Sequence, residues 1–165
     1  MCGIALGVWH HEDTQPHDAW ASVISQIQRR GRDAYHSVAC AQEGTRWELH
    51  ASVLCLRGKE LTPQPITSQD GHLHLAWNGQ IFSSEHEDDP LLDMERNDGA
   101  IIMTRLEEHA DQIPDVLVST LSAVDGPYAF VLVDTRNACI YYGRDPLGRR
   151  SLLHTTCLLY TSDAA

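Results

Sequence analysis

Apolar and polar residues alternate in short segments along most of the chain, and turn-forming residues separate these segments. Runs of this kind, rich in β-branched, aliphatic and aromatic side chains, are typical of β-strands. We therefore predict strands over residues 2–9, 37–41, 47–56, 73–77, 128–134 and 139–142.

A helical period interrupts the strand pattern after the first strand. Trp20, Val23, Ile24 and Ile27 are spaced so that they share one face of a helix, which predicts a helix over residues 18–30. Basic residues and a glycine mark the C-terminal end of this helix.

Two further helices are predicted between the fourth and fifth strands. One covers residues 98–110, with Ile102 and Leu106 on one face, and the other covers residues 114–124 and has a proline in its first turn. Strands followed by two helices and then by strands again predict an α+β fold built in layers.

Length and composition predict a single domain. The chain has 165 residues, of which 42% are apolar, and this is enough to bury one core. We place the domain at residues 2–156. Residues 157–165 continue no period and resemble a peptide translated from sequencing-adapter DNA, so we interpret them as an artificial or truncated tail. Residues 83–96 are rich in acidic side chains and are predicted to form a solvated surface loop.

The charge and the cysteines restrict the possible partners and the location. Twelve basic against 23 acidic residues give a formal net charge of −11 at pH 7, which repels nucleic acid and anionic membranes, so we expect neither as a partner. The first apolar run lacks a basic flank and no run is long enough to span a membrane, which predicts neither a signal peptide nor an anchor. Five cysteines without paired spacing fit a reducing, cytoplasmic environment.

Cys2, which directly follows the first methionine, is a candidate nucleophile. Removal of the methionine would expose a residue that carries both a thiol and a free α-amine. The thiolate is the reactive form, and an α-amine that is partly neutral at about pH 7–8 can accept the thiol proton. A small, buried, purely structural cysteine is the competing interpretation, and the position alone does not decide between the two.

Asn78 and Gly79 follow an alternating strand and have two interpretations. Asn-Gly in this context is typical of a type I′ hairpin turn, which carries no chemistry. The alternative is an oxyanion hole, in which the Asn78 side-chain amide and the Gly79 backbone N–H face the oxygen that becomes negative when a thiolate attacks an amide carbonyl.

Two other groups of residues are assigned structural roles. His72 and His74 alternate along a strand, but no third metal ligand is placed with them, so we interpret them as a polar strand face and predict no metal site. Cys55 and Cys139 lie within apolar runs and are predicted to be core residues.

Six motifs spread over residues 1–150 have the order and spacing of class II glutamine amidotransferases, and the chain resembles that family, most of all its asparagine synthetase branch. The motifs are Met1-Cys2-Gly3-Ile4, Gln28-Arg29-Arg30-Gly31-Arg32-Asp33, Gln64-Pro65, Asn78-Gly79-Gln80-Ile81-Phe82, Val124-Asp125-Gly126-Pro127-Tyr128-Ala129-Phe130 and Gly143-Arg144-Asp145-Pro146-Leu147-Gly148-Arg149-Arg150.

This resemblance implies a four-layer αββα N-terminal-nucleophile fold with two stacked antiparallel sheets, and glutamine as the substrate. It implies that Cys2 attacks the glutamine side-chain amide, that Asn78 and Gly79 hold the oxyanion, and that Asp98 binds the substrate α-ammonium group. From the residues alone, Asp98 is equally well an N-cap of the second helix. No cofactor is implied for this domain. ATP and magnesium are implied for a separate synthetase domain that would use the ammonia for asparagine biosynthesis.

Two positions depart from the family pattern. The arginine that binds the substrate α-carboxylate should lie eleven residues before Gln64, where this chain has Val53. Arg57 is the nearest substitute, but four residues along a strand displace a side chain by roughly 13 Å, so Arg57 would need a bulge or a turn to reach the site. Arg32 stands where the family usually has proline. A second hypothesis therefore stays open: a binding or regulatory module with weakened or absent glutamine turnover.

Overall fold

The computed structural model describes residues 2–10, 18–42, 44–56, 60–85, 89–93 and 95–155, so the predicted tail lies outside the described residues. Its strands are β1 (Gly3–His10), β2 (Ala34–Gln42), β3 (Thr45–Val53), β4 (Ile66–Thr67), β5 (Leu73–Gly79), β6 (Ser83–Ser84), β7 (Val124–Asp125), β8 (Tyr128–Asp134) and β9 (Cys139–Arg144). Its helices are α1 (Asp18–Gln28), α2 (Asp98–Glu108) and α3 (Ile113–Ser122), with the 3-10 helices η1 (Pro90–Leu92) and η2 (Ala110–Gln112). This mixture of helices and sheets confirms the α+β class.

The strands pair antiparallel in two main sheets. One sheet has the order β1-β3-β2 and the other has the order β4-β5-β8-β9, while β6 and β7 form a separate two-stranded ribbon. Each of the six predicted strands is present. The two-residue strands β4, β6 and β7 are too short to leave a period in the sequence. The prediction for β3 is wrong at its C-terminal end, because the strand stops at Val53 and does not continue to residue 56.

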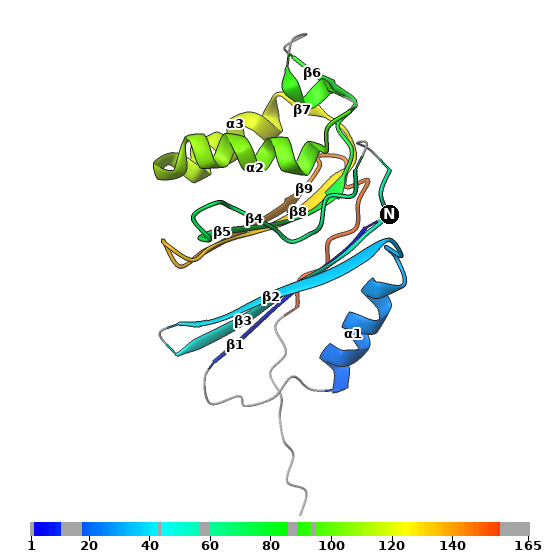
Figure 1. The fold of residues 1–165 in the computed structure, drawn as a ribbon, viewed down its shortest axis with the longest axis vertical. Coiled ribbons are helices and arrows are strands. Elements are labelled where there is room, and N and C mark those ends of the chain that lie inside the picture. The colour runs from blue at the N-terminus through cyan, green and yellow to red at the C-terminus, as the bar shows by residue number, and fades with distance from the viewer. Residues whose placement is uncertain are drawn as a thin grey trace, which may run out of the picture.

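The two main sheets pack against each other through their inner faces, and the helices cover their outer faces (Figure 1). Between the sheets, Trp47 and Leu49 of β3 meet Val131 and Val133 of β8. A second core fills the space between the other face of β5 and β8 and the helices α2 and α3. Helix α1 packs on β1 and β3 from the opposite side of the molecule.

The predicted apolar face of α1 is only partly buried. Ile27 is buried and Trp20 and Ile24 are half-buried, but Val23 is exposed. In α2, both predicted core residues are buried, and the helix ends within two residues of its predicted end. None of the helices in the described ranges has the length and apolar composition needed to cross a membrane.

The segment before α2 corrects the prediction of a solvated loop over residues 83–96. It contains β6 and η1, and both Leu91 and Asp89 are buried. The Asp89 carboxylate accepts hydrogen bonds from the Ser84 hydroxyl (2.8 Å) and the Leu91 N–H (2.9 Å), and it forms an ion pair with Arg105 of α2. These partners compensate the charge, which allows an acidic side chain to be buried here. Residues 86–88 and 94 lie outside the described part of the chain.

Candidate functional site

A pocket opens where the beginning of β1, the end of β5 and the beginning of α2 meet the segment that follows β3. It is open to solvent, and the space outside the protein atoms is about 470 Å³ when the open solvent at its mouth is included. Cys2, Asn78, Gly79 and Asp98 all line this pocket, although they come from three separate parts of the chain. The structure therefore brings together four of the five residues that were predicted to form the site. The fifth, Arg57, lies outside the described residues.

Cys2 lies half-buried just before β1. Its thiol donates to the carbonyl oxygen of Leu54 at 3.7 Å, and its sulfur accepts a hydrogen bond from the Leu54 backbone N–H at 3.5 Å. Hydrogen bonds of a thiol are weak, so these contacts orient the side chain but do not hold it tightly. Cys2 lines the pocket and belongs to neither apolar core of the described residues, which argues against a purely structural cysteine.

Gly3 determines how closely the chain beside Cys2 approaches its neighbours. A Cβ atom at Gly3 would lie 2.6 Å from the Ile27 carbonyl oxygen and 2.7 Å from the Ser52 hydroxyl oxygen. The Gly3 N–H donates to Ser52 Oγ (3.1 Å), and the Ser52 hydroxyl donates in turn to the Ile27 carbonyl oxygen (2.5 Å). A glycine is therefore required where β1, β3 and the end of α1 meet.

Asn78 and Gly79 are the last two residues of β5, so the hairpin interpretation of Asn-Gly is wrong. They pair with Ala129 and Tyr128 of β8. Gly79 does not have the positive φ that a type I′ turn requires. It is needed here for a different reason, because a Cβ atom would lie 2.5 Å from Cβ of Tyr128.

The backbone N–H of Gly79 points away from β8. In an antiparallel pair, the N–H groups of successive residues point to opposite edges of the strand. The neighbouring Gln80 N–H donates to the Pro127 carbonyl oxygen on the β8 side, at 3.0 Å. The N–H of Gly79 therefore faces the other edge of β5, along which β4 pairs only as far as Leu75.

The neighbours of Gly79 on that edge agree with this direction. The Trp77 N–H donates to Gln64 Oε1 (2.7 Å), and the Ile81 N–H donates to Asp98 Oδ2 (3.1 Å). Both acceptor residues line the pocket. Gly79 lies two residues after Trp77 and two before Ile81, so its N–H points the same way as theirs. It is therefore directed to the pocket side of the strand, where an oxyanion would have to lie.

Asp98 is 2% exposed and lies in the first turn of α2. It is not the N-cap, which corrects that alternative by one residue. The cap is Asn97, whose side chain accepts a hydrogen bond from the Ala100 N–H at 3.2 Å. Because Asp98 Oδ2 accepts from the Ile81 N–H, its carboxylate joins the start of α2 to the chain just after β5 and lies on the pocket wall as a negative group.

Val53 is buried and lines the pocket at the position where the resemblance leads one to expect an arginine. Because β3 ends at Val53, the estimate of the reach of Arg57 from a continuous strand does not apply. The Cys55 N–H donates to Asp33 Oδ2 at 2.7 Å, which anchors the segment after the strand. Arg32, beside that aspartate, is exposed.

Three pocket residues were missed or assigned wrongly from the sequence. Gln64, which holds the Trp77 N–H, and Arg150, which is half-buried, both belong to motifs of the resemblance but received no role. Cys55 was predicted to be a core residue, but it is exposed and lines the pocket because the strand has already ended. For Arg150, the signal in the sequence was its place at the end of the last of these motifs.

The turn after β9 is organised by the buried carboxylate of Asp145. Its Oδ1 accepts from the backbone N–H and the Nε–H of Arg149 (3.2 and 3.1 Å), and its Oδ2 accepts from the N–H groups of Tyr128 and Arg150 (both 3.3 Å). Arg149 also donates to Asp125 (2.7 Å). Burial alone would raise the pKa of Asp145, but the hydrogen bonds from the two arginines and Tyr128 lower that pKa to about 2.

The two histidines lie near the opposite end of β5, and their interpretation as a polar strand face is wrong. His72 precedes β5 and shares a hydrogen bond through Nδ1 with the Thr135 hydroxyl (3.1 Å). His74 is buried with its ring centroid 5.4 Å from that of Trp47, and this burial lowers the pKa of His74. Within the described ranges, no group of three histidine, cysteine or acidic side chains is arranged to hold a metal ion.

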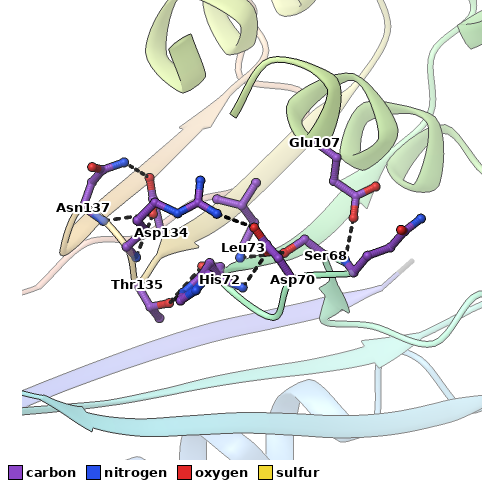
Figure 2. Close-up of polar contacts among 10 residues, drawn as sticks. Ser68, Asp70, His72, Leu73, Glu107, Asp134, Thr135 and Asn137 are labelled. Atoms are coloured by element: carbon purple, nitrogen blue, oxygen red, sulfur yellow. Dashed lines mark hydrogen bonds and ion pairs between the residues drawn. The ribbon is translucent and has the colours of Figure 1, made fainter. Parts of the chain in front are cut away.

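A polar cluster surrounds His72 at this end of the sheet (Figure 2). Asp70 accepts from the Ser68 hydroxyl (2.6 Å) and the His72 N–H (3.0 Å), and it forms an ion pair with Arg136. Asp134 accepts from the backbone and side-chain amides of Asn137 (3.1 and 2.8 Å). These bonds close the turns before β5 and after β8, far along the strand from Gly79, so we assign this cluster a structural role.

Comparison with known proteins matches residues 1–164 to a family described as glutamine amidotransferase domain. The chain is 32% identical over 153 residues to asparagine synthetase domain-containing protein 1 of Bos taurus, which covers 93% of this chain and 22% of the relative. It is 30% identical over 153 residues to the Homo sapiens protein of the same name, and the matched region is 93% of this chain and 22% of that relative. It is also 30% identical over 152 residues to the glutamine-hydrolyzing asparagine synthetase of Asparagus officinalis, with coverage of 90% and 24%. The chain thus spans less than a quarter of the length of these relatives.

Proposed function

Because the chain belongs to the glutamine amidotransferase domain family, we propose that it hydrolyses glutamine to glutamate and ammonia with Cys2 as the nucleophile. The observation that carries this proposal is a single pocket lined by Cys2, Asn78, Gly79 and Asp98. We assign the domain to residues 2–156 and its two sheets between helices to the four-layer αββα N-terminal-nucleophile fold.

The proposed reaction begins after Met1 has been removed. The Cys2 thiol gives its proton to its own α-amine, and the sulfur attacks the side-chain carbonyl carbon of glutamine. The carbonyl oxygen becomes negative and is stabilised by the Asn78 side-chain amide and the Gly79 N–H. Removal of one such donor typically costs about 3 kcal/mol of transition-state stabilisation. The direction of the Gly79 N–H, worked out from its neighbours in β5, supports this role.

Two further steps complete the reaction. The carbon–nitrogen bond breaks, the α-ammonium returns the proton to the leaving nitrogen, and ammonia departs from a Cys2 thioester. Water attacks the thioester while the amine accepts a proton from it, the carbon–sulfur bond breaks, and glutamate is released with the thiol restored. Throughout, the Asp98 carboxylate binds the α-ammonium group of the substrate, and its 2% exposure strengthens that contact.

We further propose that the ammonia serves asparagine biosynthesis in the cytoplasm. Relatives that carry the name asparagine synthetase are about four times longer than the matched region, as their coverage of 22% to 24% indicates. The proposed partner is a synthetase domain within a longer chain, which would require ATP and magnesium to aminate a carboxylate acceptor.

A glutaminase assay tests the proposal directly. Protein whose N-terminal cysteine has been verified by mass spectrometry is incubated with glutamine, and glutamate and ammonia are measured together. We expect equal amounts of the two products from the wild type and none above background from Cys2→Ala. Glutamate release that is the same in Cys2→Ala would rule out Cys2 as the nucleophile.

A buried Val53 on the pocket wall favours one alternative, a module that binds a ligand without turning glutamine over. This alternative predicts no glutamate and no covalent labelling of Cys2 by a glutamine analogue with an electrophilic side chain. The same preparation distinguishes the two, because labelling of the wild type that is lost in Cys2→Ala supports the enzyme.

A further inference from the structure

We propose that Arg150 binds the α-carboxylate of the substrate, so that Asp98 and Arg150 together select an α-amino acid in its zwitterionic form. The inference rests on the proposed function and adds a substrate-binding residue that the sequence did not indicate. It starts from the charges that face the pocket.

The pocket carries one negative and one positive side chain among the described residues that line it. These are Asp98 and Arg150, and the other lining side chains are apolar, cysteine or neutral polar groups. An α-amino acid at neutral pH has one ammonium and one carboxylate group on the same carbon. A pocket with one carboxylate and one guanidinium is the electrostatic complement of that pair, while Cys2 and Asn78 line the same pocket for the neutral side-chain amide.

The backbone of Arg150 is held in place by the turn after β9. Asp145, which is 1% exposed, accepts the Arg150 N–H through Oδ2 (3.3 Å). The preceding residue, Arg149, directs its guanidinium to Asp145 (3.1 Å) and Asp125 (2.7 Å). Of the two adjacent arginines, one therefore secures the turn and the other lines the pocket.

The chemistry of a guanidinium group suits this role. It stays protonated in proteins and presents donors in a planar fork that matches the two oxygens of a carboxylate. Arg150 is half-buried and its Nε atom is buried, so a carboxylate would meet it in a partly desolvated setting, where such a contact is stronger than at the surface.

A pair of substrates isolates the carboxylate contact. Glutamine carries the carboxylate, whereas 4-aminobutanamide retains the amine and the side-chain amide but lacks it. The chain with a free N-terminal cysteine is assayed on both compounds as wild type, Arg150→Ala and Arg150→Lys. Arg57→Ala tests the other candidate for this contact, and Arg144→Ala serves as the control, because Arg144 is exposed at the end of β9 and does not line the pocket.

We expect Arg150→Ala to raise KM for glutamine by about 10- to 100-fold and to change kcat by less than about 3-fold, since a carboxylate contact that persists through the reaction is lost. Turnover of 4-aminobutanamide should change by less than about 3-fold. The preference for glutamine, which is the ratio of its kcat/KM to that of 4-aminobutanamide, should therefore fall. Arg150→Lys should restore part of the preference, because an ammonium group keeps the charge but not the fork. If Arg150→Ala does not fold, Arg150→Lys is used for the test instead. The quantity compared is again kcat/KM for glutamine divided by kcat/KM for 4-aminobutanamide, which should be lower than in the wild type.

The outcomes separate this inference from the proposed function. If the wild type turns over glutamine but the preference is unchanged in Arg150→Ala, or is lost in Arg57→Ala instead, the assignment of Arg150 is overturned and the glutaminase stands. An equal loss on both substrates would likewise overturn the carboxylate role and assign Arg150 to structure. If the wild type has no turnover, calorimetry measures the dissociation constants of the same two compounds, and their ratio takes the place of the ratio of kcat/KM values. The absence of glutamine binding would reject both proposals.

Discussion

Replacement of Asp145 with asparagine changes the turn after β9 in a way that the structure allows us to quantify. The two carboxylate oxygens accept four hydrogen bonds, two at each oxygen, from Tyr128, Arg149 and Arg150. An asparagine amide has nearly the same shape but only one oxygen. Whichever way the amide is oriented, two of the four donors face an NH₂ group instead of an acceptor.

The number of hydrogen bonds and the pKa shift that they cause give a similar energy for this change. A hydrogen bond to a charged group contributes about 1.5 to 3 kcal/mol. Loss of two such bonds at the lower value predicts a destabilisation of about 3 kcal/mol. The pKa of Asp145 falls from 3.8 to about 2 on folding. At about 1.4 kcal/mol for each pKa unit, this shift corresponds to about 2 kcal/mol for the fully buried carboxylate. We therefore expect Asp145→Asn to lower the free energy of unfolding by about 2 to 3 kcal/mol at pH 7.

The pH dependence gives the prediction a sign. Because the folded pKa lies below the unfolded value, the carboxylate stabilises the fold above about pH 4, and this contribution is lost as the pH falls from about 4 to about 2. The difference between the wild type and Asp145→Asn should therefore be largest at pH 7 and shrink toward pH 2. Urea unfolding followed by the fluorescence of the four tryptophans measures it at each pH.

Asp125→Asn is the matched control. Asp125 also pairs with Arg149, at 2.7 Å, but its side chain is 66% exposed. An exposed ion pair contributes about 0 to 1 kcal/mol, so this variant should unfold at nearly the wild-type urea concentration. A difference below about 0.5 kcal/mol for Asp145→Asn at pH 7, or equal effects of the two variants, would refute the reasoning from burial.

Three further predictions concern other parts of the molecule. Gly3→Ala should destabilise the protein by about 2 to 4 kcal/mol in urea unfolding, because its Cβ would lie 2.6 Å from the Ile27 carbonyl oxygen, which the helix cannot easily move. For His74, burial lowers the pKa below 6.5, so stability should decline as the pH falls from about 6.5 toward that lower value, and His74→Gln should flatten this part of the pH profile. Asn78→Ala should reduce kcat for glutamine by about 100- to 1,000-fold while binding is largely kept, and an unchanged kcat would remove Asn78 from the oxyanion hole.

The sequence predicted the elements of the fold better than their ends. Long periodic segments such as α2 and β8 carry enough apolar positions to define their type, and both are present. The predicted core residues of α2 are buried, and so is every residue of β8. The end of β3 was missed because residues 54–56 remain apolar or small after the strand has stopped pairing. What stops the strand is tertiary, since the Cys55 N–H leaves the ladder to donate to Asp33.

The site was predictable to the extent that local motifs carry it. Cys2, Asn78, Gly79 and Asp98 were all identified from the sequence, and all four line one pocket. Local propensity nevertheless misread Asn-Gly as a possible turn, because the register that keeps Gly79 in the strand is imposed by Tyr128, about fifty residues away in the chain. Arg150 ends one of the motifs of the resemblance, but nothing local in the sequence assigns it to the pocket, to which it belongs with its backbone held by Asp145 in the turn after β9.

The alternation of N–H groups along β5 makes the site depend on the number of residues in the strand as well as on their identity. A single-residue insertion just before Trp77 would reverse the direction of every amide that follows. The donors now directed to Gln64, to the pocket and to Asp98 would all turn toward β8 in one step. Substitutions can adjust this strand one contact at a time, but a one-codon insertion or deletion should abolish the site at once while leaving its side chains unchanged. Length variation among active members of the family is therefore expected to fall outside this strand.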